Sequence, residues 1–180
     1  HYGSPDIVES PAEWFVFDGE GTVTEFNWAE GRENVVIPWA IGGVPVTAIG
    51  VGAFQMSDIV SVIAPQTVTM IGDYAFASCM SLASVSLPQA QTVGVGAFES
   101  CNLLASVSLP LAQTFGDYAF AYCNSLTSVS LPLAQTFGGY AFISCNSLAS
   151  VSLPQAQTVG YGAFAYCYSL ASVRMGQNAP

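Results

Sequence analysis

LASVSLPQAQTVGVGAFESCN, residues 82–102, is the stretch that decides the fold, because the chain repeats it with few changes. The dipeptide Ala-Phe recurs every 22 residues, beginning at residues 53, 75, 97, 119, 141 and 163. Cysteine recurs at the same interval from Cys79 to Cys167, and the string SVSLP begins at residues 84, 106, 128 and 150. A fixed period of this length is typical of a solenoid, in which each repeat forms one rung of a stack. The sequence therefore predicts six rungs of about 22 residues.

Each repeat contains the pattern of a short strand followed by a turn. Leucine and valine alternate with serine over residues 82–87, so one face of this strand is expected to be buried. Pro88 ends the strand, because proline has no N–H to donate to a sheet. A second extended piece is expected at residues 91–93, and residues 95–101 predict a turn or short helix that directs Phe98 inward. Because one rung cannot bury its apolar side alone, we expect the rungs to stack at about 4.8 Å and share one core.

Equivalent positions of successive rungs predict a core built from columns of identical side chains. The two predicted columns are Phe54, Phe76, Phe98, Phe120, Phe142 and Phe164, and Cys79, Cys101, Cys123, Cys145 and Cys167. Five cysteines are an odd number, and free cysteine is among the most buried residue types. Buried free thiols and one or two disulfides are both consistent with this spacing. No metal site is expected, since the chain has a single histidine, His1.

The residues before the first repeat are predicted to form a cap. Strand-like segments at 13–17 and 22–26 flank residues 18–21 (DGEG), the pattern of a β-hairpin. The two acids of this turn are consistent with a weak calcium site or, more simply, with a solvated turn. The predicted organisation is a flexible N-terminal segment at 1–12, an N-terminal β cap at 13–48, a solenoid at 49–175 and a C-terminal tail at 176–180.

Charge and composition exclude several classes of function. Only 8% of the 180 residues are charged, the formal net charge is −10, and the basic residues are Arg32 and Arg174. Nucleic-acid binding and electrostatic docking to anionic membranes both need a basic surface, so neither partner is expected. The apolar stretch 35–54 is as long as a membrane span, but its prolines and glycines interrupt a helix repeatedly. No membrane insertion is expected.

Residues 65–76 (PQTVTMIGDYAF), followed by residues 77–82 (ASCMSL), resemble the BspA-like leucine-rich repeat family of bacterial surface antigens. The lead-in at 35–54 is similar to the segment that opens such arrays. The resemblance covers about residues 20–175 and implies a right-handed leucine-rich-repeat solenoid, α/β or mainly β. It also implies a non-catalytic protein that is extracellular or exposed at the cell surface, whose signal peptide has been removed, and that adheres to host or neighbouring-cell proteins. Serine, alanine and glutamine replace most of the family's charged surface residues, so the resemblance does not identify a ligand.

The serines of the predicted strands form the candidate binding surface. The strand face is the usual binding face of leucine-rich repeats, so the resemblance points to Ser84, Ser86, Ser106, Ser108, Ser128, Ser130, Ser150, Ser152 and Arg174. These rows are consistent either with a flat polar surface for a protein or glycan or with small solvated residues that bind nothing. No histidine or lysine accompanies the serines as a base, so a serine hydrolase is not expected and no catalytic residue is assigned.

Three other sets of side chains suggest alternatives. One set predicts hydrogen bonds between rungs or, as a distant alternative, an ice- or water-ordering array; it comprises Thr92, Thr114, Thr136 and Thr158 with Gln91, Gln113, Gln135 and Gln157. Tyrosines in the turns suit partner contacts or packing, namely Tyr74, Tyr118, Tyr122, Tyr140, Tyr161, Tyr166 and Tyr168. Apolar Leu111 and Leu133, each after a proline, suit lateral contacts between copies.

The sequence as a whole predicts a non-enzymatic cell-surface or secreted module that binds a protein or glycan through the strand face. The alternative is a structural protein whose copies assemble into a fibre or lattice, since near-identical rungs of low charge suit homo-assembly. No cofactor is expected, because the sequence shows no acid pair, no nucleophile with a base and no metal-ligand set.

Overall fold

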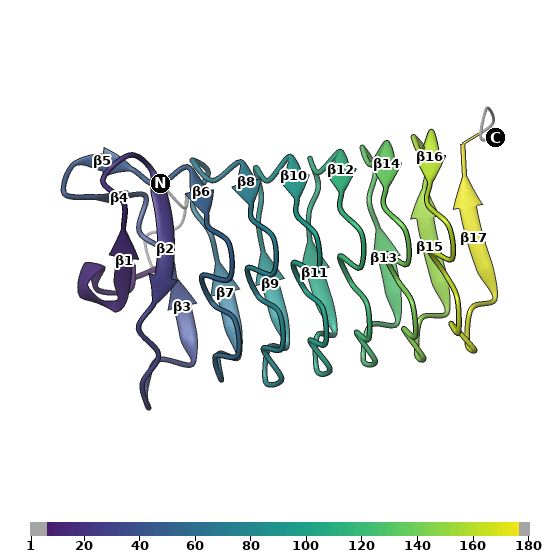
Figure 1. Ribbon diagram of the computed structural model, residues 1–180, viewed down its shortest axis with the longest axis horizontal. Helices are drawn as coiled ribbons and strands as arrows, with labels where there is room; N and C mark the ends of the chain where they lie inside the picture. The colour runs from purple at the N-terminus through teal and green to yellow at the C-terminus, as the bar shows by residue number, and fades with distance from the viewer. Residues whose placement is uncertain (1–6, 177–180) are drawn as a thin grey trace.

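The computed structural model describes residues 7–176 and is a β-solenoid, as predicted (Figure 1). About seven turns of chain stack along one axis, with the hairpin β1–β2 at one end and β17 at the other (Figure 1). Within the described residues the only helical element is the 3₁₀ turn η1 (Ala12–Trp14). Residues 1–6 of the predicted N-terminal segment and residues 177–180 of the predicted tail lie outside the described residues.

One side of the solenoid carries a continuous eight-stranded sheet, which we call the long sheet. Its first pair of strands is antiparallel, and every later pair is parallel. The second extended piece predicted for each rung is the strand that joins this sheet. In spatial order its strands are β1 (Phe15–Phe17), β2 (Thr22–Phe26), β6 (Ala48–Ile49), β8 (Met70–Ile71), β10 (Thr92–Val93), β12 (Thr114–Phe115), β14 (Thr136–Phe137) and β16 (Thr158–Val159).

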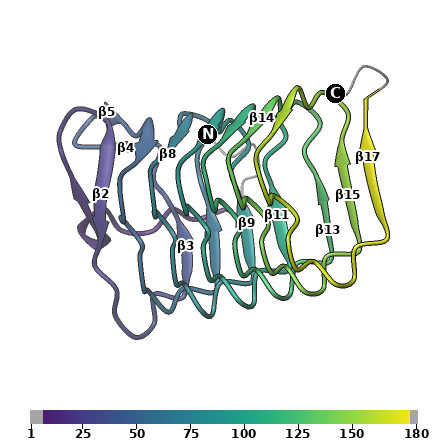
Figure 2. The same ribbon diagram turned by 45° about the vertical axis from the view of Figure 1, so that its right-hand side comes forward.

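The serine-containing strands run along another side of the solenoid, and we call their outer surface the strand face (Figure 2). These strands form two separate parallel sheets of four and three strands, because β11 and β13 do not pair. In chain order they are β3 (Asn34–Val36), β7 (Ser61–Ile63), β9 (Ser84–Ser86), β11 (Ser106–Ser108), β13 (Ser128–Ser130), β15 (Ser150–Leu153) and β17 (Ser172–Met175).

The residues predicted as a cap supply one turn of the solenoid. β1 and β2 form the predicted hairpin, and Asp18 Oδ1 closes its turn by accepting the N–H groups of Glu20, Gly21 and Thr22 at 2.7–3.0 Å. β2 then pairs in parallel with β6, and β3 pairs in parallel with β7. The six predicted rungs are present, and β2 and β3 add one further turn before them, because they join the stack through backbone pairing without the repeat motif.

The apolar stretch at 35–54 folds into short strands and loops. It runs from β3 through the two-stranded sheet of β4 (Ala40–Ile41) and β5 (Val44–Pro45) to β6. Across residues 7–176, no helix has both the length and the apolar character that a membrane crossing requires.

The core is a stack of phenylalanine rings that runs the length of the molecule. Neighbouring rings from Phe54 to Phe164 lie 5.0–5.4 Å apart and within 20° of parallel. Phe26 of the cap continues the stack onto Phe54 at 4.8 Å. Phe164, in the last turn, is only partly buried, whereas the five earlier rings are fully buried. Each buried ring contributes about 2–3 kcal/mol to stability through apolar burial.

The cysteines form a second column beside these rings. All five are free, and each Sγ donates to the carbonyl oxygen of a phenylalanine in the preceding rung at 3.0–3.2 Å. Cys167 is partly buried and the other four are buried. Of the two alternatives that the spacing allowed, the structure therefore has free thiols.

Candidate functional site

The strand face presents two straight rows of outward side chains, because alternate residues of a strand point to the same side. The first row contains the serines that open the strands, and the second contains the residues two positions later. Parallel pairing holds each row in register across each of the two sheets. The first row is Asn34, Ser61, Ser84, Ser106, Ser128, Ser150 and Ser172, and the second is Val36, Ile63, Ser86, Ser108, Ser130, Ser152 and Arg174.

The central residue of each strand is a valine that points toward the core. Val85, Val129 and Val151 are buried, while the serines beside them are exposed or partly exposed. Each of the two sheets forms a shallow depression, one of about 410 Å³ over β7, β9 and β11 and one of about 450 Å³ over β13, β15 and β17. The strand face therefore offers two shallow, uncharged surfaces of hydroxyl groups, with one cation at the end of the second.

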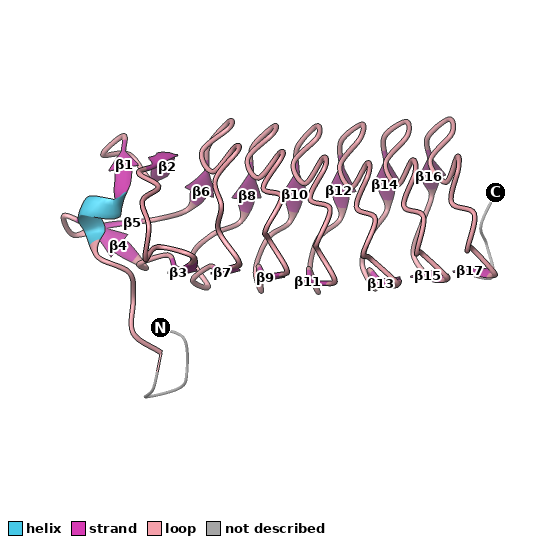
Figure 3. Ribbon diagram, turned by 90° about the horizontal axis from the view of Figure 1, so that it is seen from below, coloured by secondary structure: helices cyan, strands magenta, loops and turns pink. Residues whose placement is uncertain are grey.

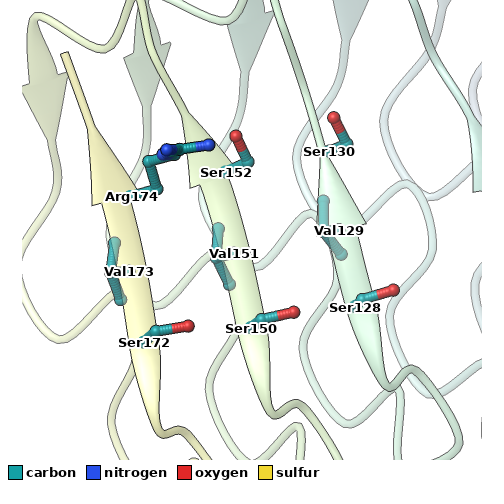
Figure 4. Close-up of a pocket in the computed structure, with 9 residues that line it drawn as sticks. All are labelled: Ser128, Val129, Ser130, Ser150, Val151, Ser152, Ser172, Val173 and Arg174. Atoms are coloured by element: carbon teal, nitrogen blue, oxygen red, sulfur yellow. The ribbon is translucent and has the colours of Figure 1, made fainter.

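Arg174 is the only charged side chain in the two rows. It lies opposite Ser152 in the register of β15 and β17, and its side chain extends over β15 (Figure 4). The side chain of Arg174 makes no ion pair and no hydrogen bond to any residue in the range 7–176. The serines and Arg174 that the resemblance pointed to therefore lie together on the strand face, with Arg174 at the end of the second row.

The pairing of the strand face is interrupted between β11 and β13, and we call this interruption the β11/β13 break. At the other junctions between repeats, the residue before the strand donates to the preceding rung, as from Ala105 to Ala83 at 3.0 Å and from Ala149 to Thr127 at 2.8 Å. Among the described residues, Thr127 makes no such bond to Ala105. The Cα atoms of β11 and β13 lie mostly more than 8 Å apart, and Figure 3 shows this wider separation beside the even spacing of the long sheet.

The other end of these two strands shows the same loss of pairing. Leu87 donates to Ser108 at 3.0 Å and Leu131 donates to Ser152 at 3.1 Å, but Leu109 has no bond to Ser130 within residues 7–176. Val107, the central residue of β11, is only partly buried, in contrast to the valines of β9, β13 and β15. The break therefore exposes backbone groups that are paired at the neighbouring junctions.

Large core side chains coincide with the break. The two rungs that flank it carry Phe115 and Phe137 where the neighbouring rungs carry Val93 and Val159. These two rings stack at 4.8 Å, and each also contacts the phenylalanine column. Additional volume in a packed core forces the backbone to move. We therefore attribute the separation of β11 and β13 to these two rings.

Glycines explain why the long sheet stays closed at the same junction. A Cβ on Gly138 would clash with the backbone nitrogen of Asp117, so the two rungs that flank the break touch at this corner. Gly116 makes a similar close approach to the backbone of Val95 at the preceding junction. Because this corner of the solenoid is in backbone contact, the added ring volume separates the rungs on the opposite side, at the strand face.

The chemistry available at the strand face is that of hydroxyl groups, backbone groups and one guanidinium. Cys79, Cys101 and Cys123 are poor nucleophiles in this state, since burial raises the pKa of Cys79 to about 12 and raises the pKa of Cys101 and Cys123 as well. The described residues contain no group of three or more His, Cys, Asp or Glu side chains placed to hold a metal ion. Asp18, weighed above as a calcium ligand, uses one oxygen to close its turn.

Sequence reasoning missed members of the first row. Ser172 lies 22 residues after Ser150, so the repeat spacing was sufficient to find it. Ser61 lies 23 residues before Ser84, because the first repeat is one residue longer. Asn34 comes from the cap and had no repeat signal; its Oδ1 accepts a hydrogen bond from Ser61 Oγ at 2.7 Å.

The amide column forms at a different position from the one expected. Among the described residues, the side chains of the four glutamines make no hydrogen bonds between rungs, although their backbones do. Instead Asn124 donates to Asn102 at 3.4 Å and Asn146 donates to Asn124 at 3.2 Å. The threonines of the long sheet lie in register and are mostly exposed.

The tyrosines occupy the turns on a third side of the solenoid. Tyr118 and Tyr140 stack on each other at 5.3 Å, so part of this set packs between rungs. Tyr161 and Tyr168 are 82% and 80% exposed, although each contacts another tyrosine ring, so the last turn presents aromatic surface to solvent. Leu133 is 39% exposed, and Leu111 is partly buried.

Comparison with known proteins places the repeat in a described family. A family model, the BspA-type leucine-rich repeat region, matches residues 46–178 in six copies. A search of curated proteins finds no significant match to this chain.

Solved structures with the same architecture come from several bacteria. A leucine-rich repeat protein of T. pallidum is 33% identical with a TM-score of 0.85, and the match covers 94% of this chain and 82% of that one. A leucine-rich repeat protein of Bacteroides ovatus is 25% identical with a TM-score of 0.71, over 92% of this chain and 41% of that one. A leucine-rich cell surface protein of Faecalibacterium prausnitzii is 23% identical with a TM-score of 0.69, over 91% of this chain and 52% of that one. This chain therefore spans about half or less of the last two proteins, and the last of them bears on the fold alone.

Proposed function

The chain belongs to the BspA-type leucine-rich repeat family, and from that premise we propose that it is a non-enzymatic adhesion module, secreted or exposed at the cell surface. It binds a protein or glycan through the strand face. The observation that carries this proposal is the pair of serine-rich surfaces held in register by β7–β9–β11 and β13–β15–β17, the first uncharged and the second with Arg174 at its end. Serine hydroxyls both donate and accept hydrogen bonds, so they suit polar partners such as a peptide backbone or a sugar.

The chemistry of the chain supports binding rather than catalysis. A serine becomes a nucleophile when a base removes its proton, and no base lies in the two rows described above. Low charge and many small polar residues also suit an extracellular surface.

Replacing neutral serines of the strand face by arginine tests the proposal. Wild-type protein is screened by biolayer interferometry against immobilised extracellular glycoproteins and neutral oligosaccharides. The variant Ser84→Arg/Ser152→Arg places a long cation on each depression and is expected to weaken binding about tenfold or more. The control Thr92→Arg/Thr158→Arg makes the same change in the same two rungs on the long sheet and is expected to bind like wild type. Absence of any ligand, or equal loss in both variants, contradicts the proposal.

Self-assembly is the second candidate, and the partial exposure of Leu111 and Leu133 beside each other favours it. Lateral association through these leucines buries them between copies. Light scattering across a concentration series tests this, since a monomer has a mass of 18.8 kDa. Ordered oligomers that dissociate in Leu111→Gln/Leu133→Gln support assembly, whereas a monomer at all concentrations excludes it.

A further inference from the structure

The β11/β13 break leaves two strand edges facing each other without a partner. On the β11 side the N–H of Leu109 has no acceptor, and on the β13 side the N–H of Thr127 has none, within residues 7–176. Strands on both outer sides of the break are fully paired, β9 with β11 and β13 with β15. Backbone groups in a sheet need partners, so this pair of edges is a template for added backbone.

Neither edge carries the features that proteins use to prevent strand addition. Proline, charged residues, bulges and a short covering segment are the usual protections of an open edge. β11 and β13 both read Ser-Val-Ser, without charge, proline or glycine. The four serines of the two edges are exposed, so the approach from solvent is open.

We propose that the β11/β13 break accepts one extended peptide strand of a partner protein, which pairs with β11 on one side and β13 on the other. This inference rests on the proposed function, because the break lies within the strand face. Two strand spacings amount to about 9.6 Å. β11 and β13 are already separated, because their Cα atoms lie mostly more than 8 Å apart, and a strand enters only when the two edges move further apart. We expect the long sheet, whose backbones touch at Gly138 on the other side of these rungs, to stay closed as the edges separate.

The surroundings define the chemistry of the peptide. A strand in the break alternates between residues that face solvent beside Ser106 and Ser128 and a residue that faces the core beside Val107 and Val129. The inward residue is therefore small and apolar, preferably β-branched, and its neighbours are uncharged and polar. A proline or a charge at the inward position is excluded, since proline removes a backbone donor and a charge cannot be buried unpaired. The motif polar–valine–polar, which this protein uses in its own strands, satisfies these requirements.

A synthetic peptide tests the proposal directly. The probe is fluorescein-labelled SLASVSLP, the sequence of residues 147–154, with a capped C-terminus. Fluorescence anisotropy is expected to show saturable binding to wild-type protein. A matched peptide with an N-methyl group on its valine nitrogen keeps the side chains but loses one backbone donor, and we expect it to bind about tenfold more weakly.

A pair of variants separates the break from the rest of the strand face. Phe115→Val/Phe137→Val removes the ring volume that separates the strands, and we expect about tenfold or greater loss of peptide binding. Leu111→Gln/Leu133→Gln converts the same two rungs to the neighbouring sequence at another position where both differ from their neighbours, and it is expected to bind like wild type. Circular dichroism confirms that both variants are folded, and the N-methyl peptide keeps the test informative if one is not.

Amide hydrogen exchange gives an independent readout. In the free protein Leu109 and Thr127 are expected to exchange faster than Leu87 and Ala149, and the peptide is expected to protect them. No binding at about 1 mM peptide, equal affinity of the N-methylated peptide, or full binding by Phe115→Val/Phe137→Val overturns the inference. If a ligand from the screen above still responds to Ser84→Arg/Ser152→Arg, the proposed function stands and only the peptide inference fails.

Discussion

The long sheet and the strand face are built from the same rungs, yet the long sheet is continuous through eight strands and the strand face is divided. At the junction between β12 and β14, glycine brings the backbones into contact and the rungs pair. On the opposite side of that junction, β11 and β13 are separated. Phe115 and Phe137 lie in the core between the two surfaces. The difference shows that side-chain volume inside each rung, rather than the identity of the strands, determines whether successive rungs pair on a given face.

The largest expected effect concerns the ring column that both surfaces share. Phe120 is fully buried between Phe98 and Phe142 and also contacts Phe115 beside the break. Phe120→Ala removes this ring and is expected to lower the free energy of unfolding by about 3–5 kcal/mol, as for other buried phenylalanines. Urea denaturation followed by circular dichroism measures it. Phe164→Ala, at the partly buried end of the column, is the control and costs less. A loss below about 1 kcal/mol for Phe120→Ala contradicts the ring column as the core.

The next prediction would remove the difference between the two surfaces. Phe115→Val/Phe137→Val gives these rungs the core residue of their neighbours, so β11 and β13 are expected to approach and pair. The amides of Leu109 and Thr127 then exchange about 10–100-fold more slowly, equivalent to about 1.4–2.7 kcal/mol per site. Amide exchange measured by NMR checks this, with Leu111→Gln/Leu133→Gln as the control. Unchanged exchange at both amides would show that the rings do not cause the break.

Part of the fold could be predicted from the sequence, and part could not. A 22-residue period places every phenylalanine and cysteine of the repeats in a column, because equivalent positions of stacked rungs meet. The period does not locate β2 and β3, which join the stack through backbone hydrogen bonds that depend little on side-chain identity. Nor does it select the asparagines over the glutamines as the amide column, since that depends on which turn brings side chains within reach.

Part of the candidate site could also be predicted from the sequence. Strand alternation places the serines on one outer surface, and the structure adds Ser61 and Ser172 to the row. The β11/β13 break could not be predicted from the sequence. The substitutions at Phe115 and Phe137 are visible in the sequence, but their consequence depends on the closed glycine corner opposite, which only the structure reveals.

The cysteine column continues across the junction that carries the break, and its response to pH measures how well this part of the core excludes water. Cys145 still donates to Phe120 at 3.1 Å there. Cys79, in a rung nearer the N-terminus, is the member of the column whose pKa gives the test below. Burial raises the pKa of Cys79 from 9.0 to about 12, so the folded state keeps a proton that the unfolded state loses. Stability is therefore fully present below pH 9 and falls as the pH rises toward 12.

At pH 10 the contribution of Cys79 is reduced by about 1.4 kcal/mol, one pH unit above the unfolded pKa. Urea denaturation at pH 8 and pH 10 for wild type and Cys79→Ala isolates this effect, since the variant lacks that proton. An equal fall in stability for both proteins would mean that the Cys79 thiol titrates in the folded state as it does when unfolded. Thiol titration after unfolding without reductant should find all five cysteines, of which partly buried Cys167 reacts first in the folded protein.

The smallest expected effect concerns the corner that closes the long sheet. Asp117 Oδ1 accepts the N–H of Gly139 at 2.6 Å, across the junction opposite the break, and Asp73 Oδ1 accepts the N–H of Val95 at 2.8 Å at a junction where both surfaces are paired. Each exposed carboxylate–amide bond contributes about 1 kcal/mol, so Asp73→Ala and Asp117→Ala are both mildly destabilising. Among the described residues, the strand face contributes no hydrogen bonds between the rung of Asp117 and the next rung. Fewer hydrogen bonds therefore remain to hold these two rungs together when the Asp117 bond is removed. We therefore expect Asp117→Ala to accelerate amide exchange in β12 and β14 more than Asp73→Ala does in β8 and β10. Equal acceleration at the two junctions would show that the break does not weaken the rung pair that carries it.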